Sequence, residues 1–172
     1  MASTLRVIDA LKNPGQEYAF TADAVLEEMD VMGDPVRFSD IAAKGTFVGT
    51  SESVSIEAEV TATVISRCAR CLGEVSFPIT AQMQAVFAHE PDPEDPDQYG
   101  FEGSSLELTD AVKDALVLEL PLRFLCSEDC KGLCVKCGTN LNTGTCKCQK
   151  DDDELNPFAA LRSMIVDNNE EV

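Results

Sequence analysis

The residues best suited to chemistry in this sequence are its cysteines. Eight are present, and six of them lie in one glycine-punctuated stretch, CSEDCKGLCVKCGTNLNTGTCKC, at 126–148. Thiolates separated by two residues can bind one zinc ion from a tight turn, and a structural zinc site takes four such ligands in a tetrahedron. The spacing therefore predicts metal binding. The candidate ligands are Cys68, Cys71, Cys126, Cys130, Cys134, Cys137, Cys146 and Cys148.

The preferred partition of these cysteines is one local site and one site built from remote segments. The local site contains Cys134, Cys137, Cys146 and Cys148. The remote site contains Cys68, Cys71, Cys126 and Cys130. Crossed pairing in the manner of a zinc ribbon, with 68–71 joining 134–137, is an alternative. One zinc ion with spare thiols and a four-sulfur iron site are two others. The prediction is one or two zinc ions per chain.

Disulfides and redox catalysis are the competing interpretations of the cysteines. The first residues lack the basic and apolar regions of a secretory signal, and no apolar stretch approaches the ~18–20 residues that would span a bilayer. We therefore expect a cytoplasmic protein without membrane contact, in which thiols stay reduced. A redox pair is typical of a helix N-terminus in a βαβ unit. Neither Cys-x-x-Cys of this chain has that setting, so metal binding is favoured.

Alternation of apolar and polar residues predicts the main structural element. It runs through 54–64 and resumes through 75–87. Two such runs predict a long antiparallel hairpin, with Cys68 and Cys71 at its tip. Pro78 lacks a backbone donor, so it should face away from a ladder partner or lie on an edge.

One helix and several short strands complete the expected elements. The segment 106–120 predicts a helix with Thr109 as its N-cap. Pro121 disfavours helical backbone before it, so the helix should end by Leu120. Short strands are expected at 5–11, 18–20 and 46–50, and 23–32 is ambiguous between helix and strand. The predicted fold is α+β: an antiparallel sheet or partly closed β-barrel built on the hairpin, one packed helix, and a C-terminal Cys-rich zinc knuckle.

Three parts are expected along the chain. Residues 1–125 form the core domain, and 126–150 form the Cys-rich metal-binding segment that packs on the 68–71 tip. An acidic linker and a short C-terminal helix occupy 151–172. Within the core, 90–103 is an acidic insert that cannot bury enough apolar surface to order itself, which predicts an exposed or disordered loop.

The charge of the chain is strongly negative. Acidic residues number 31 against 13 basic ones, for a formal net charge of −18 at pH 7. Such a chain is a poor partner for a phosphate backbone and a good electrostatic match for a basic protein. The simpler interpretation is that the excess of acidic residues only makes the protein soluble. Three lysines of the Cys-rich segment are candidate RNA contacts, although ordinary solvent exposure explains them as well: Lys131, Lys136 and Lys147.

Catalytic patterns are weak in this sequence. The single histidine, His89, lies at the edge of the acidic insert, and the carboxylates are scattered through loops and tails. Neither a P-loop nor a G-x-G-x-x-G motif is present. We therefore expect no enzymatic activity. A ribonuclease that uses carboxylate-bound magnesium and a thiol redox protein are the weaker alternatives.

Together these motifs resemble one protein family. A strand ending in CARCL, a helix followed by ELPLRFLCSEDCKGLCVKCGTNLN, a terminal CKC and then NPFAALRSM are similar to the YceD family of large ribosomal RNA subunit accumulation proteins. The resemblance covers roughly residues 1–166, and CKGLCVKCGTNLN is its most specific part. It implies a role in making or maturing the large ribosomal subunit, through accumulation or processing of its RNA, with no established catalysis.

The resemblance and the charge together predict a non-catalytic ribosome-biogenesis factor. Such an acidic chain would bind a basic ribosomal protein or another assembly factor, and would influence ribosomal RNA indirectly. A direct RNA-binding zinc module is the main alternative, and it predicts binding that weakens steeply with salt.

Overall fold

The computed structural model describes residues 4–148. Two compact units divide the chain between Cys130 and Lys131, a few residues after the sequence-based boundary at 125. The short helix expected within 151–172 lies outside the described residues. None of the helices in the described part of the chain has the length and apolar character needed to cross a membrane.

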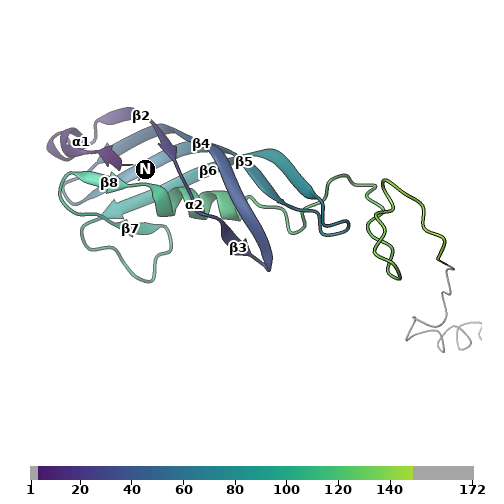
Figure 1. The fold of residues 1–172 in the computed structure, drawn as a ribbon. Coiled ribbons are helices and arrows are strands. Elements are labelled where there is room, and N and C mark those ends of the chain that lie inside the picture. The colour runs from purple at the N-terminus through teal and green to yellow at the C-terminus, as the bar shows by residue number, and fades with distance from the viewer. Residues whose placement is uncertain (1–3, 149–172) are drawn as a thin grey trace, which may run out of the picture. The chain divides into compact units, whose positions relative to one another are not determined.

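The first unit is built on an open sheet with strand order β2-β4-β5-β6-β7, and β3 pairs separately with β4 (Figure 1). All neighbours are antiparallel except β6 and β7, which are parallel. Of the two predicted architectures, the antiparallel sheet is the one found. The strands are β2 (Glu17–Ala24), β3 (Met29–Val31), β4 (Asp34–Gly49), β5 (Ser53–Arg67), β6 (Glu74–Ala88) and β7 (Gln98–Gly100).

The predicted long hairpin is confirmed as β5 and β6. The two strands pair without interruption from Ser53 opposite Ala88 to Arg67 opposite Glu74. Even-numbered β5 residues are buried, whereas their neighbours are exposed or half-buried, as the alternation predicts. Pro78 lies in a part of β6 whose only sheet neighbour is β5, so its edge position is confirmed.

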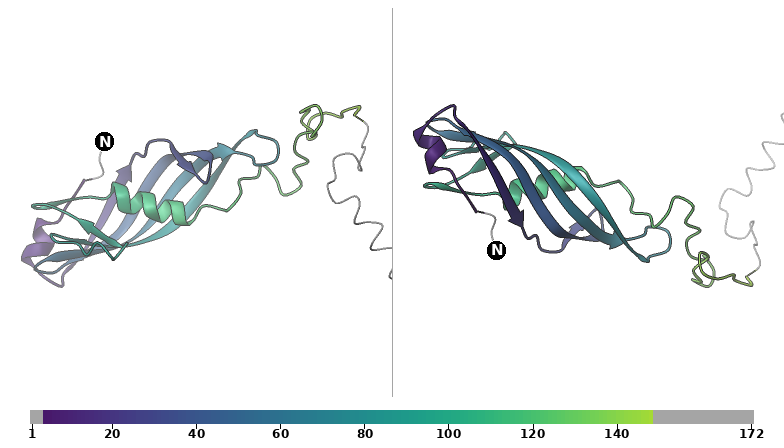
Figure 2. Two further views of the ribbon diagram at one scale, coloured as in Figure 1. Left: turned by 90° about the horizontal axis from the view of Figure 1, so that it is seen from below. Right: turned by 90° about the horizontal axis from the view of Figure 1, so that it is seen from above.

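The predicted helix is present as α2 (Thr109–Leu118), which ends before Leu120 as expected. It lies across one face of the sheet and packs mainly on β6 (Figure 2). The predicted start is wrong, because residues 105–107 form strand β8 (Ser105–Glu107), paired with β1 (Thr4–Arg6). The N-cap is Leu108, and the Thr109 hydroxyl donates instead to the Glu107 carboxylate at 3.3 Å. The helix buries four residues, Ala111, Val112, Ala115 and Leu116.

The short upstream elements are partly as expected. Segments 18–20 and 46–50 fall almost entirely within β2 and β4, but the strand predicted at 5–11 is wrong in its second half, where α1 (Ile8–Lys12) forms. Ala10 of this helix is fully buried. A Cβ on Gly49 would lie only 2.5 Å from the Ala10 carbonyl oxygen, so this close approach of helix and strand requires glycine.

The acidic insert is more ordered than its composition predicts. Residues 89–94 are exposed, but residues 98–100 form β7 on the edge of β6. Tyr99 stacks on Phe87 with ring centroids 5.3 Å apart, and Phe101 is buried. The prediction of an exposed or disordered loop is therefore wrong for 98–101, because two aromatic rings anchor this stretch despite the acid around it.

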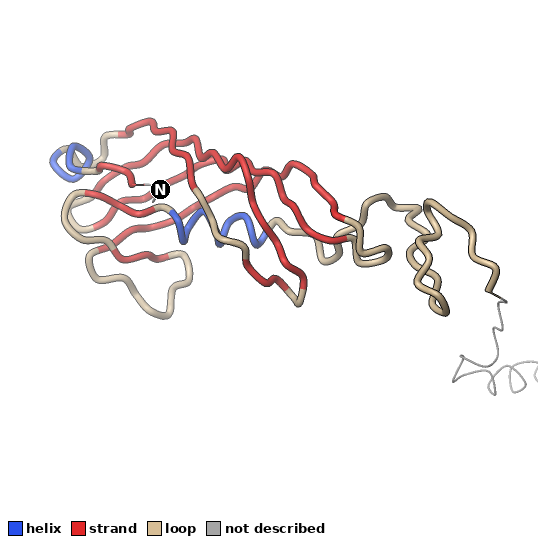
Figure 3. The backbone as a smooth tube through the Cα atoms, in the orientation of Figure 1, coloured by secondary structure: helices blue, strands red, loops and turns tan. Residues whose placement is uncertain are grey.

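The second unit, as far as the structure describes it, is residues 131–148. No helix or extended strand forms within this range, which is drawn as loop in Figure 3. Its backbone is held by tight turns and by one isolated bridge between Leu133 and Asn140. Gly132 is the one residue of this range that is buried. The range therefore has no hydrophobic core of its own.

Candidate metal centres

Four cysteines of the first unit converge at the tip of the β5–β6 hairpin. Their sulfur atoms lie within 4.8 Å of one another. The Sγ atoms of Cys68 and Cys130 are 3.8 Å apart, and those of Cys71 and Cys126 are 3.7 Å apart. A zinc ion with Zn–S bonds of about 2.3 Å places tetrahedral sulfurs about 3.8 Å apart. The geometry of this first cluster (Cys68, Cys71, Cys126 and Cys130) therefore fits one tetrahedral metal ion.

A tight turn at the hairpin tip presents the first pair of sulfurs. The Cys68 N–H donates to the Gly73 carbonyl at 2.8 Å, and the Leu72 N–H donates to the Cys68 carbonyl at 2.9 Å. Leu72 takes a positive φ of 58°, which lets the chain turn back into β6. The turn holds Cys68 fully buried and leaves Cys71 8% exposed.

The segment after α2 brings the second pair to this tip. The Ala69 N–H donates to the Phe124 carbonyl at 2.8 Å, and the Phe124 ring contacts that of Phe77 with centroids 6.1 Å apart. Phe124 is buried, so it anchors the chain just before Cys126. Backbone hydrogen bonding and aromatic contact therefore dock this segment independently of the sulfurs.

Arg70 joins the two halves of the first cluster. Its guanidinium Nη1 donates to the Glu128 carbonyl at 2.9 Å and to the Cys130 carbonyl at 3.0 Å. Arg70 thus belongs to the Cys68–Cys71 loop but holds the backbone that carries Cys130. Arg70 was not predicted from the sequence as a functional residue. The only sequence feature that pointed to it was its position between the candidate ligands Cys68 and Cys71.

The backbone of the first cluster favours thiolate at one sulfur. Burial acts to raise the pKa of Cys68, but backbone N–H groups of Cys126, Cys71 and Arg70 lower it to about 6. Hydrogen bonding with Cys130 and Cys71 raises the pKa of Cys126 to about 12. Four thiolates therefore do not form together without a compensating cation, and a divalent metal would supply that charge.

The second cluster consists of Cys134, Cys137, Cys146 and Cys148, whose sulfurs also lie within 4.8 Å of one another. Its knuckle turns at Gly138, which has a φ of +71° and donates its N–H to the Cys134 carbonyl at 2.8 Å. Glycine adopts this positive φ without the Cβ clash that other residues would meet, so the chain can turn past the sulfurs here.

The electrostatics of the second cluster repeat those of the first. Backbone N–H groups of Cys137 and Lys136 lower the pKa of Cys134 to about 6. Hydrogen bonding with Cys137 raises the pKa of Cys148 to about 12. This cluster also needs a cation before all four sulfurs carry charge.

The grouping of the eight cysteines is the one preferred from the sequence. None of them is joined in a disulfide. The structure brings Cys68 and Cys71 together with Cys126 and Cys130, not with the 134–137 pair as the crossed alternative requires. Both clusters could hold a metal ion. The identity of that metal as zinc stays a prediction.

The three candidate RNA-contacting lysines all belong to the second unit. Lys131, Lys136 and Lys147 are exposed, and the Lys131 backbone N–H donates to the Asn142 side chain at 2.8 Å. Val135, at the centre of the knuckle, is 91% exposed. An RNA-binding role for these residues stays a prediction.

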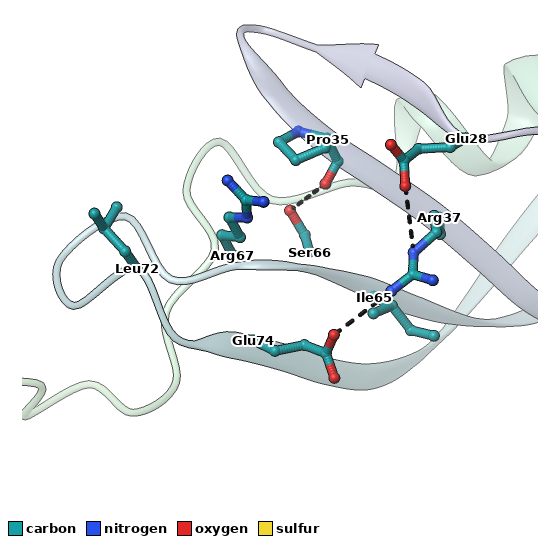
Figure 4. A pocket seen from close by; sticks show the side chains of 8 residues that line it. All are labelled: Glu28, Pro35, Arg37, Ile65, Ser66, Arg67, Leu72 and Glu74. Carbon is teal, nitrogen blue, oxygen red and sulfur yellow. Dashed lines mark hydrogen bonds and ion pairs between the residues drawn. The ribbon is translucent and has the colours of Figure 1, made fainter.

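A pocket of about 260 Å³ lies beside the hairpin tip (Figure 4). Arg37 on its wall is paired with Glu28 at 3.4 Å and with Glu74 at 3.5 Å. Ser66 is buried, and its hydroxyl donates to a backbone carbonyl at 3.0 Å. The Arg67 guanidinium makes no hydrogen bond or ion pair with any other described residue. Two acids and two arginines balance here, so the pocket has no net charge to select a ligand.

These features define a sheet-based protein with one four-cysteine cluster at a hairpin tip and another in a separate small unit. Residues 56–164 match the family described as large ribosomal RNA subunit accumulation protein YceD, which is more than half of the chain. The chain belongs to this family, as the sequence motifs indicated.

Individual relatives extend this result. The chain is 29% identical to the uncharacterized protein YlbN of Bacillus subtilis over 123 residues, which cover 69% of this chain and 72% of that one. It is 34% identical to an uncharacterized protein of Mycobacterium leprae over 97 residues, 53% of this chain and 44% of the relative.

A plant relative carries the family's descriptive name. The chain is 30% identical over 66 residues to the chloroplastic large ribosomal RNA subunit accumulation protein YCED homolog 1 of Arabidopsis thaliana. That match covers 37% of this chain and 21% of the plant protein. The chain thus spans less than half of the mycobacterial relative and about a fifth of the plant one. No solved structure matches this chain.

Proposed function

We propose that this protein is a non-catalytic, zinc-stabilised ribosome-biogenesis factor that supports accumulation or processing of the large-subunit ribosomal RNA. The observation that carries the proposal is its membership of the YceD family, whose plant member is named for large ribosomal RNA subunit accumulation. The two four-cysteine clusters are its metal sites, and zinc would hold their segments in place.

The donor set supports a structural role for the metal. Catalytic zinc has three protein ligands and keeps a fourth position for water or substrate, whereas structural zinc is closed by four. Each cluster supplies four sulfurs, which complete the tetrahedron. Nδ1 of the single histidine, His89, lies 3.1 Å from the Phe101 carbonyl oxygen, and the His89 and Phe101 rings are in tilted contact with centroids 4.2 Å apart. This histidine is therefore used in local structure.

The charge distribution supports a basic protein as the partner. Through residue 130, the first unit contains 24 acidic and 8 basic residues. Opposite fields accelerate encounter with a positively charged partner, whereas a phosphate backbone is repelled. A basic ribosomal protein or an assembly factor with a basic segment fits this unit, and ribosomal RNA would respond indirectly.

The test combines a cellular and a biochemical measurement. Depleting the protein from its host should lower large-subunit ribosomal RNA relative to small-subunit RNA, and the intact chain should restore the ratio. At physiological salt, the purified chain should capture basic ribosomal proteins both before and after nuclease treatment of the sample. Unchanged RNA ratios on depletion, or capture of naked ribosomal RNA without any basic protein, would contradict the proposal.

A direct RNA-binding role for the second unit is the second candidate. Residues 131–148 contain three lysines and no acidic residue, in contrast to the first unit. RNA binding through this unit should weaken steeply with salt, and neutralising Lys136 and Lys147 should reduce both affinity and salt dependence. Bound metal in these variants controls for an intact knuckle.

A further inference from the structure

One long edge of the main sheet is open. β6 runs from Glu74 to Ala88, but β7 covers only Val86–Ala88. From Glu74 to Ala85 the only sheet neighbour of β6 is β5, on the opposite side. In both views of Figure 2, α2 lies over a face of the sheet, so it does not form a further strand at this edge.

Hydrogen bonds at the end of β6 show which of its backbone groups point outward. The Val86 N–H donates to the Asp97 carbonyl at 2.9 Å, and the Ala88 carbonyl accepts from Phe101 at 3.1 Å. Backbone groups alternate between the two sides of a strand, and the pairing with β5 has no bulge. The N–H and C=O groups of Thr80, Gln82 and Gln84 therefore also point to the open edge.

These outward groups have no hydrogen-bond partner elsewhere in the described part of the chain. Pro78 has the same parity, so its missing donor falls on the open side, where proline costs no bond with β5. Natural edge strands are usually protected by charged side chains, prolines or bulges. From Ile79 to Ala85, β6 has none of these.

The surroundings of this edge are acidic. Glu57 and Glu59 of β5 lie directly opposite Gln84 and Gln82. The loop that joins β6 to β7, residues 89–97, contains five acids and no lysine or arginine, and its last residue bonds β6 at Val86. A strand added at this edge would lie next to the acidic loop, whereas Glu57 and Glu59 would lie two strands away from it, on the other side of β6. A second copy of this chain would bring the same acidic loop, and like charges would oppose that contact.

We infer that the edge of β6 from Thr80 to Gln84 binds an extended, lysine- and arginine-rich segment of a partner protein as an added β-strand. Main-chain hydrogen bonds to the outward groups of β6 provide the register, and the surrounding acids select basic side chains. This inference rests on the proposed function, because it specifies how a basic partner is held.

The experiment uses the full metal-loaded chain and, as probe, the protein fraction extracted from purified large ribosomal subunits and freed of RNA. Hydrogen–deuterium exchange is measured on the chain with and without the captured protein, together with affinity. Gln82→Pro removes one outward donor and leaves the β5 ladder intact. Gln82→Ala is the matched control, because it removes the same side chain and keeps the donor. A thermal melt checks that both variants fold.

The expected result is slower exchange at 79–85 in the complex and about ten-fold weaker binding of Gln82→Pro, the loss expected when a donor is removed and its partner is left unpaired. Gln82→Ala should bind as the unmodified chain does. Binding without protection at 79–85, or equal affinity of the two variants, would overturn the inference and leave the proposed basic partner intact.

Two further outcomes would also contradict the inference: self-association of the chain at the edge of β6, and the absence of any binding partner among the large-subunit proteins. Protection of 79–85 that grows with the concentration of the chain alone would show that a second copy occupies the edge, which contradicts the inference. If no large-subunit protein binds at all, the inference is overturned, and the proposed function is then judged separately by the depletion measurement. The exchange measurement on the unmodified chain remains decisive if Gln82→Pro does not fold.

Discussion

The two four-cysteine clusters use the same ligands but are built in opposite ways. The first joins a hairpin tip to a segment 62 positions away in sequence, and three of its cysteines are buried against the sheet unit. The second lies within 134–148, in a range with no core of its own. A metal bound by the first cluster would therefore be added to a fold that already has a core, whereas a metal bound by the second would have to create the fold around it.

The largest effect is expected from Cys134→Ser. It should release the metal of the second cluster and unfold residues 131–148, because no buried apolar residue in this range can replace the metal. Metal content by native mass spectrometry should fall from two ions to one, and amide exchange in this range should become fast. Slow exchange in the metal-free range would show that the knuckle folds without its ion.

A smaller effect is expected from Cys68→Ser. This change should release the other metal and lower the stability of the first unit by about 3 kcal/mol, since it disrupts a fully buried ligand, but the sheet should stay folded. A fall of roughly 10 °C in Tm corresponds to that loss. Circular dichroism should retain the strand signal. Loss of that signal would show that the first unit, like the second, depends on its metal to fold.

Arg70→Gln tests whether the first cluster depends on groups beyond its ligands. Arg70 holds the backbone of Glu128 and Cys130, so its loss should speed metal transfer to a chelator by about ten-fold at this cluster only. Arg67→Gln is the matched control, because that guanidinium makes no bond with another described residue. Equal release rates for the two variants would assign Arg70 no positioning role.

The smallest difference between the clusters is expected in their pH dependence. Cys68 and Cys134 both have a pKa lowered from 9.0 to about 6. A lowered pKa stabilises the folded state above pH 9, and this contribution is lost as pH falls towards 6. Protons also compete with metal for thiolate, so both metals should leave in acid, below about pH 6. Release of metal to a chelator at alkaline pH, and not in acid, would contradict this prediction.

Local patterns predicted the elements whose own residues decide their structure. The alternation through 54–64 and 75–87 predicted the hairpin, because burial of one face requires a period of two. The Cys-x-x-Cys and Cys-x-Cys spacing placed the second cluster, because all its ligands lie within one short segment. Composition predicted an exposed or disordered loop at 98–101, and this was wrong because Tyr99 and Phe101 are anchored by residues outside that segment.

The sequence by itself determined which residues can ligate metal, where the long hairpin turns, and how strongly the chain is charged. Only the tertiary structure decided that the hairpin tip meets the segment after α2, because that contact depends on Arg70, Phe124 and Phe77 coming together from separate elements. It also decided that β6 ends the sheet over most of its length. Local spacing specifies ligands and periodicity, but which edge stays unpaired depends on where every other strand has found its neighbour.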